Sequence, residues 1–249
     1  MNVWGARVRS PNVNCMLAAW LLRQGLMGRG ERRFFETALK RGQTVVDVGA
    51  NQGIFTLLFS RLVGPEGRVF AFEPAPTLFA AVDANCRLNG ADNVTRFQLA
   101  AGATRSDAVL HCSRFNSGDN RLTDSIKGPA VPVSVVRLDE ILPSGPVHLI
   151  KIDVQGYERH VVEGMQGILD RNSAIKVFFE YWPEGLGYAG CVPAELLEFF
   201  LVRGFALFEL SSSGLRKLPR REVTRSMRVG KWSWRNLLAA REGVGIAAD

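Results

Sequence analysis

The chain has 249 residues, of which 47% are hydrophobic, and a formal net charge of +7. This length and apolar content suit one catalytic α/β domain with a sizeable core and small extensions. The apolar runs are shorter than the roughly 18 residues that cross a bilayer, so neither a membrane span nor a signal peptide is expected.

Residues 1–43 predict an N-terminal helical extension. Two helical patterns, 14–26 and 31–40, flank the glycines Gly28 and Gly30. We expect this extension to pack against, or cover, the domain that follows it, which spans residues 44–249.

From residue 44 onward, short apolar runs alternate with helical patterns. The predicted order is strand 44–48, helix 54–63, strand 69–73, helix 77–89 and strand 95–99. Strands that alternate with helices require right-handed crossovers, which predict a parallel sheet with helices on both faces.

The second half of the chain repeats this alternation after one interruption. A strand pair around 108–112 and 131–136 encloses the polar interval 114–128, which is either a plain surface loop or a flap near a ligand. The elements that follow are strand 147–152, helix 158–169, strand 174–181, helix 193–201 and strand 205–210. The tail from Leu215 can supply a closing strand and a final segment through 232–240.

A glycine turn joins the first predicted strand to its helix, in the run Thr44-Val-Val-Asp-Val-Gly-Ala-Asn-Gln-Gly53. Gly49 and Gly53 have no Cβ to collide with a ligand, and Ala50 and Asn51 lie between them. The turn lacks the middle glycine with which dinucleotide sites approach a pyrophosphate. Asp47 would repel a phosphate and could hold an ammonium group. The pattern therefore favours a cationic nucleoside without phosphate, and S-adenosylmethionine fits that description.

Carboxylates lie at or near the ends of four predicted strands, namely Asp47, Glu73, Asp153 and Glu180. Because ligands bind beyond the carboxyl ends of parallel strands, these acids are expected to converge on one site. Glu73, followed by Pro74, is placed to accept hydrogen bonds from a ribose diol. Asp153 could orient or deprotonate an acceptor hydroxyl, or only cap a helix. Glu180 lies in an apolar strand, where a lone charge is costly, so it serves either the site or an ion pair.

The remaining reactive side chains do not form a recognisable cluster. Cys15, Cys86, Cys112 and Cys191 form no Cys-x-x-Cys pair, so we expect reduced thiols in a cytoplasmic protein. His111, His148 and His160 are the candidate histidine bases, of which His148 and His160 are interpreted as structural. No metal site is predicted because no ligand spacing occurs.

Basic residues crowd the C-terminal region around Trp232 and Trp234. These residues are Arg216, Lys217, Arg220, Arg221, Arg225, Arg228, Lys231 and Arg235. Tryptophans among cations suit base stacking. The preferred interpretation is a solvated basic face above a core with two buried tryptophans, so a nucleic-acid partner is not favoured.

Five motifs follow one another along residues 40–210. They are Val45-Val-Asp-Val-Gly-Ala-Asn-Gln-Gly-Ile-Phe-Thr56, Val69-Phe-Ala-Phe-Glu-Pro74, Asn85 with Leu88-Asn89, Arg137-Leu-Asp-Glu-Ile-Leu142, and Leu149-Ile-Lys-Ile-Asp-Val-Gln-Gly-Tyr-Glu158 with Glu163-Gly164. Together they resemble the FkbM-type S-adenosylmethionine-dependent methyltransferases.

The resemblance implies a Rossmann-like class I methyltransferase fold, with a mostly parallel seven-stranded sheet that ends in a reversed hairpin. It also implies methylation of a hydroxyl, commonly on a sugar, polyketide or other natural product. By position, the cofactor would contact Asp47, Gly49, Ala50, Asn51, Gly53, Glu73, Pro74 and Asp153. Glu73 would hold the ribose, whereas the glycine turn would line the methionine end.

Two positions depart from the family pattern. Gln155 stands where the family usually has Glu, which removes a charge near the expected reaction centre. The segment 98–102 offers no acidic side chain for the adenine amine.

The leading hypothesis is a methyltransferase that acts on a small-molecule hydroxyl, with Asp153 or Glu180 as the catalytic acid–base residue. One alternative is an RNA or protein methyltransferase that docks through the basic C-terminal region. Another is a binding protein with a vestigial cofactor site. The sequence leaves the acceptor and the oligomeric state open.

Overall fold

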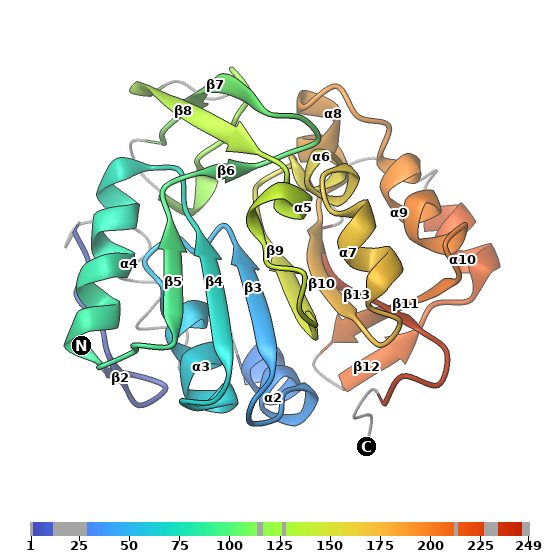
Figure 1. Cartoon of the computed structure of the whole chain (residues 1–249). Helices are drawn as coiled ribbons and strands as arrows, with labels where there is room; N and C mark the ends of the chain where they lie inside the picture. The colour runs from blue at the N-terminus through green and yellow to red at the C-terminus, as the bar shows by residue number, and fades with distance from the viewer. Residues whose placement is uncertain are drawn as a thin grey trace.

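The computed structural model describes residues 2–11, 29–113, 117–125, 128–211, 214–226 and 234–245. Its centre is an eight-stranded sheet (Figure 1). In spatial order the strands are β12 (Gly214–Lys217), β11 (Phe205–Ser211), β13 (Arg235–Arg241), β10 (Lys176–Tyr181), β9 (Leu149–Ile152), β3 (Thr44–Val48), β4 (Arg68–Phe72) and β5 (Val94–Phe97). The strands from β10 to β5 are parallel, and β13 is inserted antiparallel between β10 and β11.

The sheet has one strand more than the seven expected. Seven strands include the antiparallel pair β11 and β13, of which β13 is the reversed strand, and β12 adds an eighth strand, antiparallel to β11, at the edge. The left-handed Gly214 (φ 107°) lets the chain turn back, and Arg216 forms an ion pair with its cross-strand neighbour Glu209. A local turn and a cross-strand pair therefore account for the extra strand.

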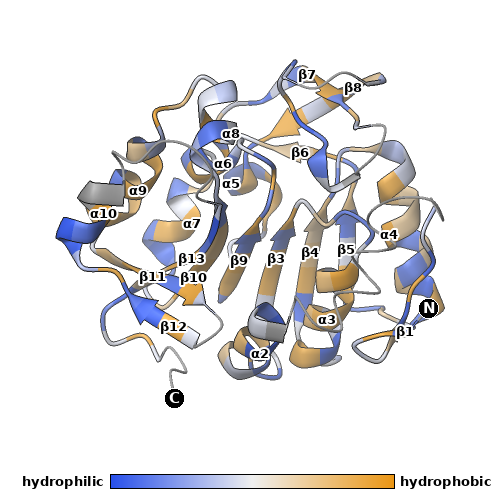
Figure 2. Ribbon diagram, turned by 180° about the vertical axis from the view of Figure 1, so that it is seen from behind, coloured by the Kyte–Doolittle hydropathy of each residue, from blue (hydrophilic) through white to orange (hydrophobic). Residues whose placement is uncertain are grey.

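The two faces of the sheet bury separate hydrophobic clusters (Figure 2). Along β3, Val46 packs into one cluster and Val45 into the other, as the alternation of a strand requires. Helices α2 (Arg29–Ala38), α3 (Ile54–Val63) and α4 (Pro76–Leu88) contribute buried residues to the cluster of Val45. Helices α5 (Leu138–Ile141), α6 (Glu158–Glu163), α7 (Gln166–Arg171), α8 (Pro183–Tyr188), α9 (Pro193–Leu201) and α10 (Arg220–Ser226) contribute to the other.

The described part of residues 1–43 is less helical than expected. It begins with a hairpin of β1 (Asn2–Val3) and β2 (Ala6–Arg7), and α2 corresponds to the helix expected at 31–40. The helix expected at 14–26 lies outside the described residues. Asn85 of α4 holds the hairpin end through both backbone groups of Arg9, and it also donates to the Gln52 carbonyl.

A second, three-stranded sheet lies above the carboxyl end of the large one (Figure 1). Its order is β6 (Ala100–Ala101), β8 (Ala130–Val136), β7 (Ser106–His111). The antiparallel pairing of β7 and β8 confirms the predicted strand pair. A bridge from His111 to Arg121 ties part of the intervening segment, including the 3-10 turn η1 (Ser117–Asp119), to this small sheet.

The helix expected at 158–169 is two helices. The chain breaks at Gly164, where a Cβ would lie 2.0 Å from the carbonyl oxygen of Gly102. Asp139 then starts α7, because its carboxylate accepts hydrogen bonds from the Gly167 and Ile168 amides at 3.0 and 2.8 Å. Within the described ranges, no helix is long and apolar enough to cross a bilayer.

Candidate active site

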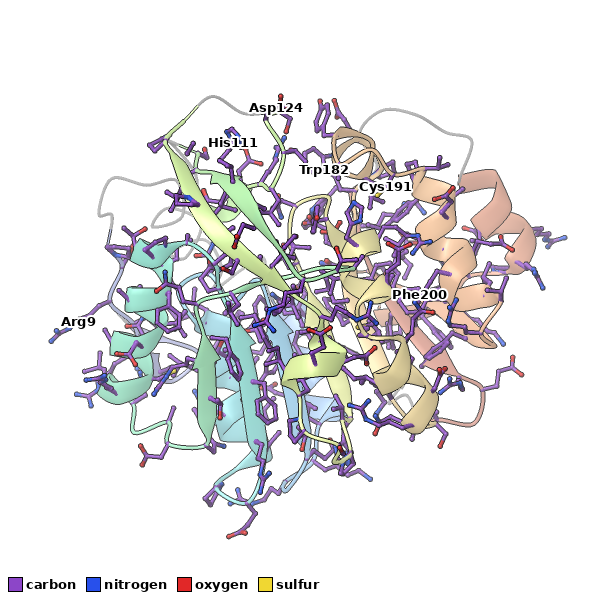
Figure 3. All side chains as sticks on the ribbon, turned by 45° about the horizontal axis from the view of Figure 1, so that its top comes forward. Arg9, His111, Asp124, Trp182, Cys191 and Phe200 are labelled. Atoms are coloured by element: carbon purple, nitrogen blue, oxygen red, sulfur yellow. The ribbon has the colours of Figure 1, made fainter. Side chains whose placement is uncertain are left out.

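A cavity of about 350 Å³ opens at the carboxyl ends of β3, β4, β9 and β10, beneath the three-stranded sheet. Figure 3 tilts this end of the molecule forward, with His111 of β7 and Trp182, just before α8, labelled. Of the residues expected in the site, the cavity is lined by Gly49, Ala50, Asn51, Glu73, Pro74, Asp153 and Glu180. Asp47 and Gly53 are not among the lining residues.

The glycines of the turn are required for protein packing. Gly49 has φ 81°, and a Cβ there would lie 1.9 Å from the carbonyl oxygen of Asp153. Its missing side chain therefore admits the loop after β9, rather than the ligand as the sequence suggested. Gly53 has φ 83°, and a Cβ there would make ordinary contacts with Val82, so backbone conformation is the reason for this glycine. Asn51 is also left-handed (φ 53°).

Glu73 is almost fully buried at the tip of β4 and forms part of the cavity wall. Its Oε2 accepts a hydrogen bond from the Asn51 amide at 2.8 Å, and its Oε1 accepts one from the Ala75 amide at 3.0 Å. Burial raises the pKa of Glu73 to about 7, although the two backbone hydrogen bonds lower it by favouring the ionised carboxylate. A ribose diol that donates to this carboxylate would favour its ionised form further.

Asp47 is wholly buried and paired within the protein. Its carboxylate accepts hydrogen bonds from Thr56 Oγ1 at 2.6 Å and from Lys151 Nζ at 3.2 Å. The ammonium group beside Asp47 is therefore that of Lys151, which does line the cavity. Lys151 was missed by sequence reasoning, although a lysine within the apolar run His148-Leu-Ile-Lys-Ile152 was a signal for a buried pair.

Asp153 and Glu180 come together, and one side chain joins them. Gln155 Nε2 donates to Asp153 Oδ1 and to Glu180 Oε2, each at 2.9 Å. The other oxygen of Glu180 accepts from the indole of Trp234. Burial first, and then the charges of Asp153 and Glu158, raise the pKa of Glu180 well above its ordinary value.

The two acids differ in their access to the cavity. The Asp153 side chain is 40% exposed, and its Oδ2 lies 3.7 Å from Lys151 Nζ. Glu180 is only 5% exposed, and both of its oxygens accept hydrogen bonds from protein donors. Asp153 is thus the acid of the pair that can meet a second substrate.

Trp234 lies at the cavity and not in the core position that was preferred for it. It is 59% exposed, so it is not a core tryptophan, and it lines the cavity beside Glu180. Among its basic neighbours, Arg216 pairs with Glu209 and Glu222, Lys217 with Glu242, and Arg235 with Glu209. Arg228, Lys231 and Trp232 lie outside the described residues.

The histidines lie outside the cavity lining. His148 Nδ1 accepts a hydrogen bond from the Thr44 amide at 3.0 Å, which joins β3 to the start of β9. His160, on α6, lies beside Cys191, with 3.4 Å between its Nε2 and the Cys191 Sγ. Within the described ranges, no group of three or more His, Cys, Asp or Glu residues could hold a metal ion.

A model of the methyltransferase FkbM domain matches residues 47–207. The chain belongs to the FkbM methyltransferase family. Its FkbM-family relatives include the 31-O-demethyl-FK506 methyltransferase FkbM of Streptomyces tacrolimicus, 33% identical over 162 residues. Methyltransferase 1 of Beauveria bassiana is 32% identical over 146 residues. The matches cover 51% and 49% of this chain and 61% and 57% of the relatives, so under two thirds of each relative is spanned.

Solved structures support the fold of this FkbM-family chain. A putative rRNA methylase from Clostridium thermocellum has a TM-score of 0.52 at 13% identity, covering 86% of this chain and 95% of that one. The O-methyltransferase TomG from Streptomyces achromogenes has a TM-score of 0.51 at 12% identity, with coverages of 94% and 92%. At these identities the likeness shows the Rossmann-like class I methyltransferase fold alone.

S-adenosylmethionine is the cofactor expected of an FkbM-family member, and the residues present fit it. The wall offers the Glu73 carboxylate for a diol and the left-handed turn at Asn51. Among the described lining residues, the cationic side chain is Lys151. Because Lys151 is already paired with Asp47, the wall suits a ligand without phosphate.

Proposed function

We propose that this chain transfers a methyl group from S-adenosylmethionine to a hydroxyl of an uncharged small molecule. The observation that carries the proposal is the division of the cavity wall. Glu73 and the glycine turn occupy the β3–β4 end, whereas Asp153 and Glu180 occupy the β9–β10 end. A donor and an acceptor held at these two ends would meet near Asp153.

The donor end comprises Gly49, Ala50, Asn51, Glu73 and Pro74 in the wall. Gly53 and Asp47 are joined to it through Ala50 and Lys151. Glu73 would receive hydrogen bonds from the ribose hydroxyls, because its carboxylate is fixed by the Asn51 and Ala75 amides. Asp47 would act indirectly, by holding the Lys151 ammonium against the turn, where Lys151 Nζ also lies 3.4 Å from the Gly49 carbonyl. The cofactor supplies an electrophilic methyl group on a sulfonium.

At the acceptor end, Asp153 is proposed as the general base and Glu180 as its support. Asp153 would accept the hydroxyl proton, and S-adenosylmethionine, when bound, would supply the methyl group to the acceptor oxygen. The products would be a methyl ether, S-adenosylhomocysteine and a protonated Asp153, which would release its proton to water. Alignment of the hydroxyl with the methyl group supplies much of the rate.

The wall favours an acceptor without negative charge. Glu73, Asp153 and Glu180 are acidic, and Lys151 is engaged by Asp47. Apolar side chains, including Leu99, Leu110, Leu122, Val154 and Trp234, supply much of the remaining surface. A phosphorylated acceptor would be repelled, whereas the hydroxyl of a polyketide, a neutral sugar or another natural product would fit. The name of the Streptomyces relative, a 31-O-demethyl-FK506 methyltransferase, supports an oxygen acceptor.

The first test measures cofactor binding. Calorimetry with S-adenosylmethionine is expected to show binding to the native protein and a loss of roughly 10- to 100-fold in affinity for Glu73→Ala, since a charged hydrogen-bond acceptor is removed. Glu66→Ala, at an exposed position outside the cavity, is the matched control. Unchanged affinity in Glu73→Ala would remove the ribose assignment, and no binding to the native protein would support a vestigial site.

The second test concerns the base. The assay measures methyl transfer to a neutral natural product that the native protein methylates. In this assay Asp153→Asn is expected to lower kcat by roughly 100-fold or more, which is the usual contribution of general-base catalysis. Normal turnover in Asp153→Asn would exclude Asp153 as the base while leaving cofactor binding intact.

A further inference from the structure

The side-chain amide of Gln155 touches both acids at the acceptor end. Its Nε2 lies 2.9 Å from an oxygen of Asp153 and 2.9 Å from an oxygen of Glu180. Both N–H bonds of that nitrogen are therefore used by carboxylates, which accept and cannot donate when ionised. The carbonyl end of the amide could not take this place, because it would add a third acceptor.

Two carboxylates this close ordinarily need a proton or a cation between them. The charged groups facing the pair are Lys151 on β9, Asp47 on β3 and Glu158 on α6. Lys151 is closer to Asp47, at 3.2 Å, than to Asp153, at 3.7 Å, so most of its charge is balanced there. Gln155 is left as the donor that joins the two acids.

The backbone holds Gln155 in place from both sides. Gln155 itself is left-handed (φ 55°), a conformation that costs a non-glycine residue energy and marks functional loops. Gly156 follows with φ 102°, and a Cβ there would lie 2.3 Å from the Gly185 carbonyl oxygen of α8. The buried Glu158 Oε1 accepts hydrogen bonds from the Val154 and Gly156 amides, at 3.2 and 3.1 Å. The loop therefore presents the Gln155 amide in one orientation.

We propose that Gln155 is the positioning residue of the acid pair. Its amide is a neutral double donor that lets Asp153 and Glu180 lie together. By holding one oxygen of Asp153, it also turns the other oxygen towards the acceptor. This role rests on the proposed function, because it matters for catalysis only if Asp153 is the base. Without the amide, the pair would retain a proton to higher pH.

The experiment is a titration of side-chain carboxyl carbons by ¹³C NMR on the full-length protein, with signals assigned from Asp153→Asn and Glu180→Gln. In Gln155→Met, which keeps the side-chain length but cannot donate, the apparent pKa of the pair is expected to rise by about one unit or more, a tenfold change. Gln98→Met, at an exposed position, is the matched control and should leave the titration unchanged. An unchanged titration in Gln155→Met would overturn the proposal.

A second variant keeps the test decisive if Gln155→Met does not fold. Gln155→Glu has nearly the native shape and adds a third carboxyl, so it is expected to hold one proton more than the native cluster at pH 7. Three ionised carboxylates at that pH would overturn the proposal. Neither titration needs an acceptor or a cofactor, so a failure of S-adenosylmethionine binding would refute the proposed function without deciding the role of Gln155.

Discussion

Buried ionisable side chains surround the cavity, and each is explained by a specific neighbour. Lys151 and Asp47 neutralise one another, whereas backbone amides donate to both carboxylate oxygens of Glu73 and to Oε1 of Glu158. Unpaired burial of any of them would cost several kcal/mol. The contact between Lys151 and Asp47 joins residues 104 positions apart in the chain, which is why the sequence identified the acids but missed Lys151.

The pKa of Glu158 provides a stability test. Burial raises it from 4.5 to about 7 in the folded protein, so the folded state binds the proton more tightly than the unfolded chain. This contribution to stability is complete below pH 4.5 and is lost as pH rises to about 7. We expect the native free energy of unfolding to fall across this window, by up to about 3 kcal/mol from this group.

Urea denaturation at several pH values measures that slope. Glu158→Gln keeps an oxygen for the Val154 and Gly156 amides and cannot titrate, so its stability should vary less with pH than that of the native protein. Glu66→Gln, which is exposed, should retain the native slope. Parallel native and Glu158→Gln curves would show that Glu158 is not the titrating group.

A single polar side chain, that of Asp139, connects the short helices α5 and α7. Asp139 of α5 accepts hydrogen bonds from the first amides of α7 and lies near Arg137 and Arg171, at 3.3 and 3.8 Å. This explains why an acidic residue follows Leu138 in one of the family motifs. The break at Gly164 lets α6 and α7 pack separately, and a hydrophobic pattern that is continuous across the break could not reveal it.

Asp139→Ala is expected to lower the free energy of unfolding by roughly 1–2 kcal/mol, because two amides at the start of α7 lose their acceptor. Chemical denaturation provides the measurement. Glu140→Ala, on the same helix with a 45% exposed side chain, should change stability by less than about 0.5 kcal/mol. Equal effects of the two substitutions would argue that Asp139 does not start α7.

Across the molecule, the excess positive charge and the cavity are separate features. The net charge is +7, yet the described residues of the C-terminal basic group include Arg216, Lys217 and Arg235, which form ion pairs. The cavity wall is acidic. A positive molecule with an acidic pocket suits an uncharged acceptor better than an anionic one.

Binding of a fluorescent single-stranded RNA is therefore expected to be weak at 150 mM salt and unaffected by the paired substitution Arg220→Ala with Arg221→Ala. Fluorescence anisotropy between 50 and 200 mM salt measures this. Affinity that falls steeply with salt, and is lost in the double variant, would instead favour the docking of a nucleic acid on the C-terminal region.

Much of the fold was readable from local patterns. The helix at 54–63 and the strand at 44–48 have the predicted bounds, because hydrophobic period and glycine turns act over a few residues. The closing strand expected from Leu215 corresponds to β12, whereas α8 was not assigned, since it is a short helix whose formation depends on contacts with distant segments. The glycine turn was found correctly, but the close contact of Gly49 with Asp153 required the folded chain.

By itself, the sequence determined the order of strands and helices, the family, and the acids that end the strands, since these are properties of residues near one another in the chain. Only the tertiary structure decided that Asp47 faces Lys151, that Glu180 is shielded while Asp153 is exposed, and that Gln155 joins the two. Distances between parallel strands are set by packing and crossover geometry, and no local pattern contains them.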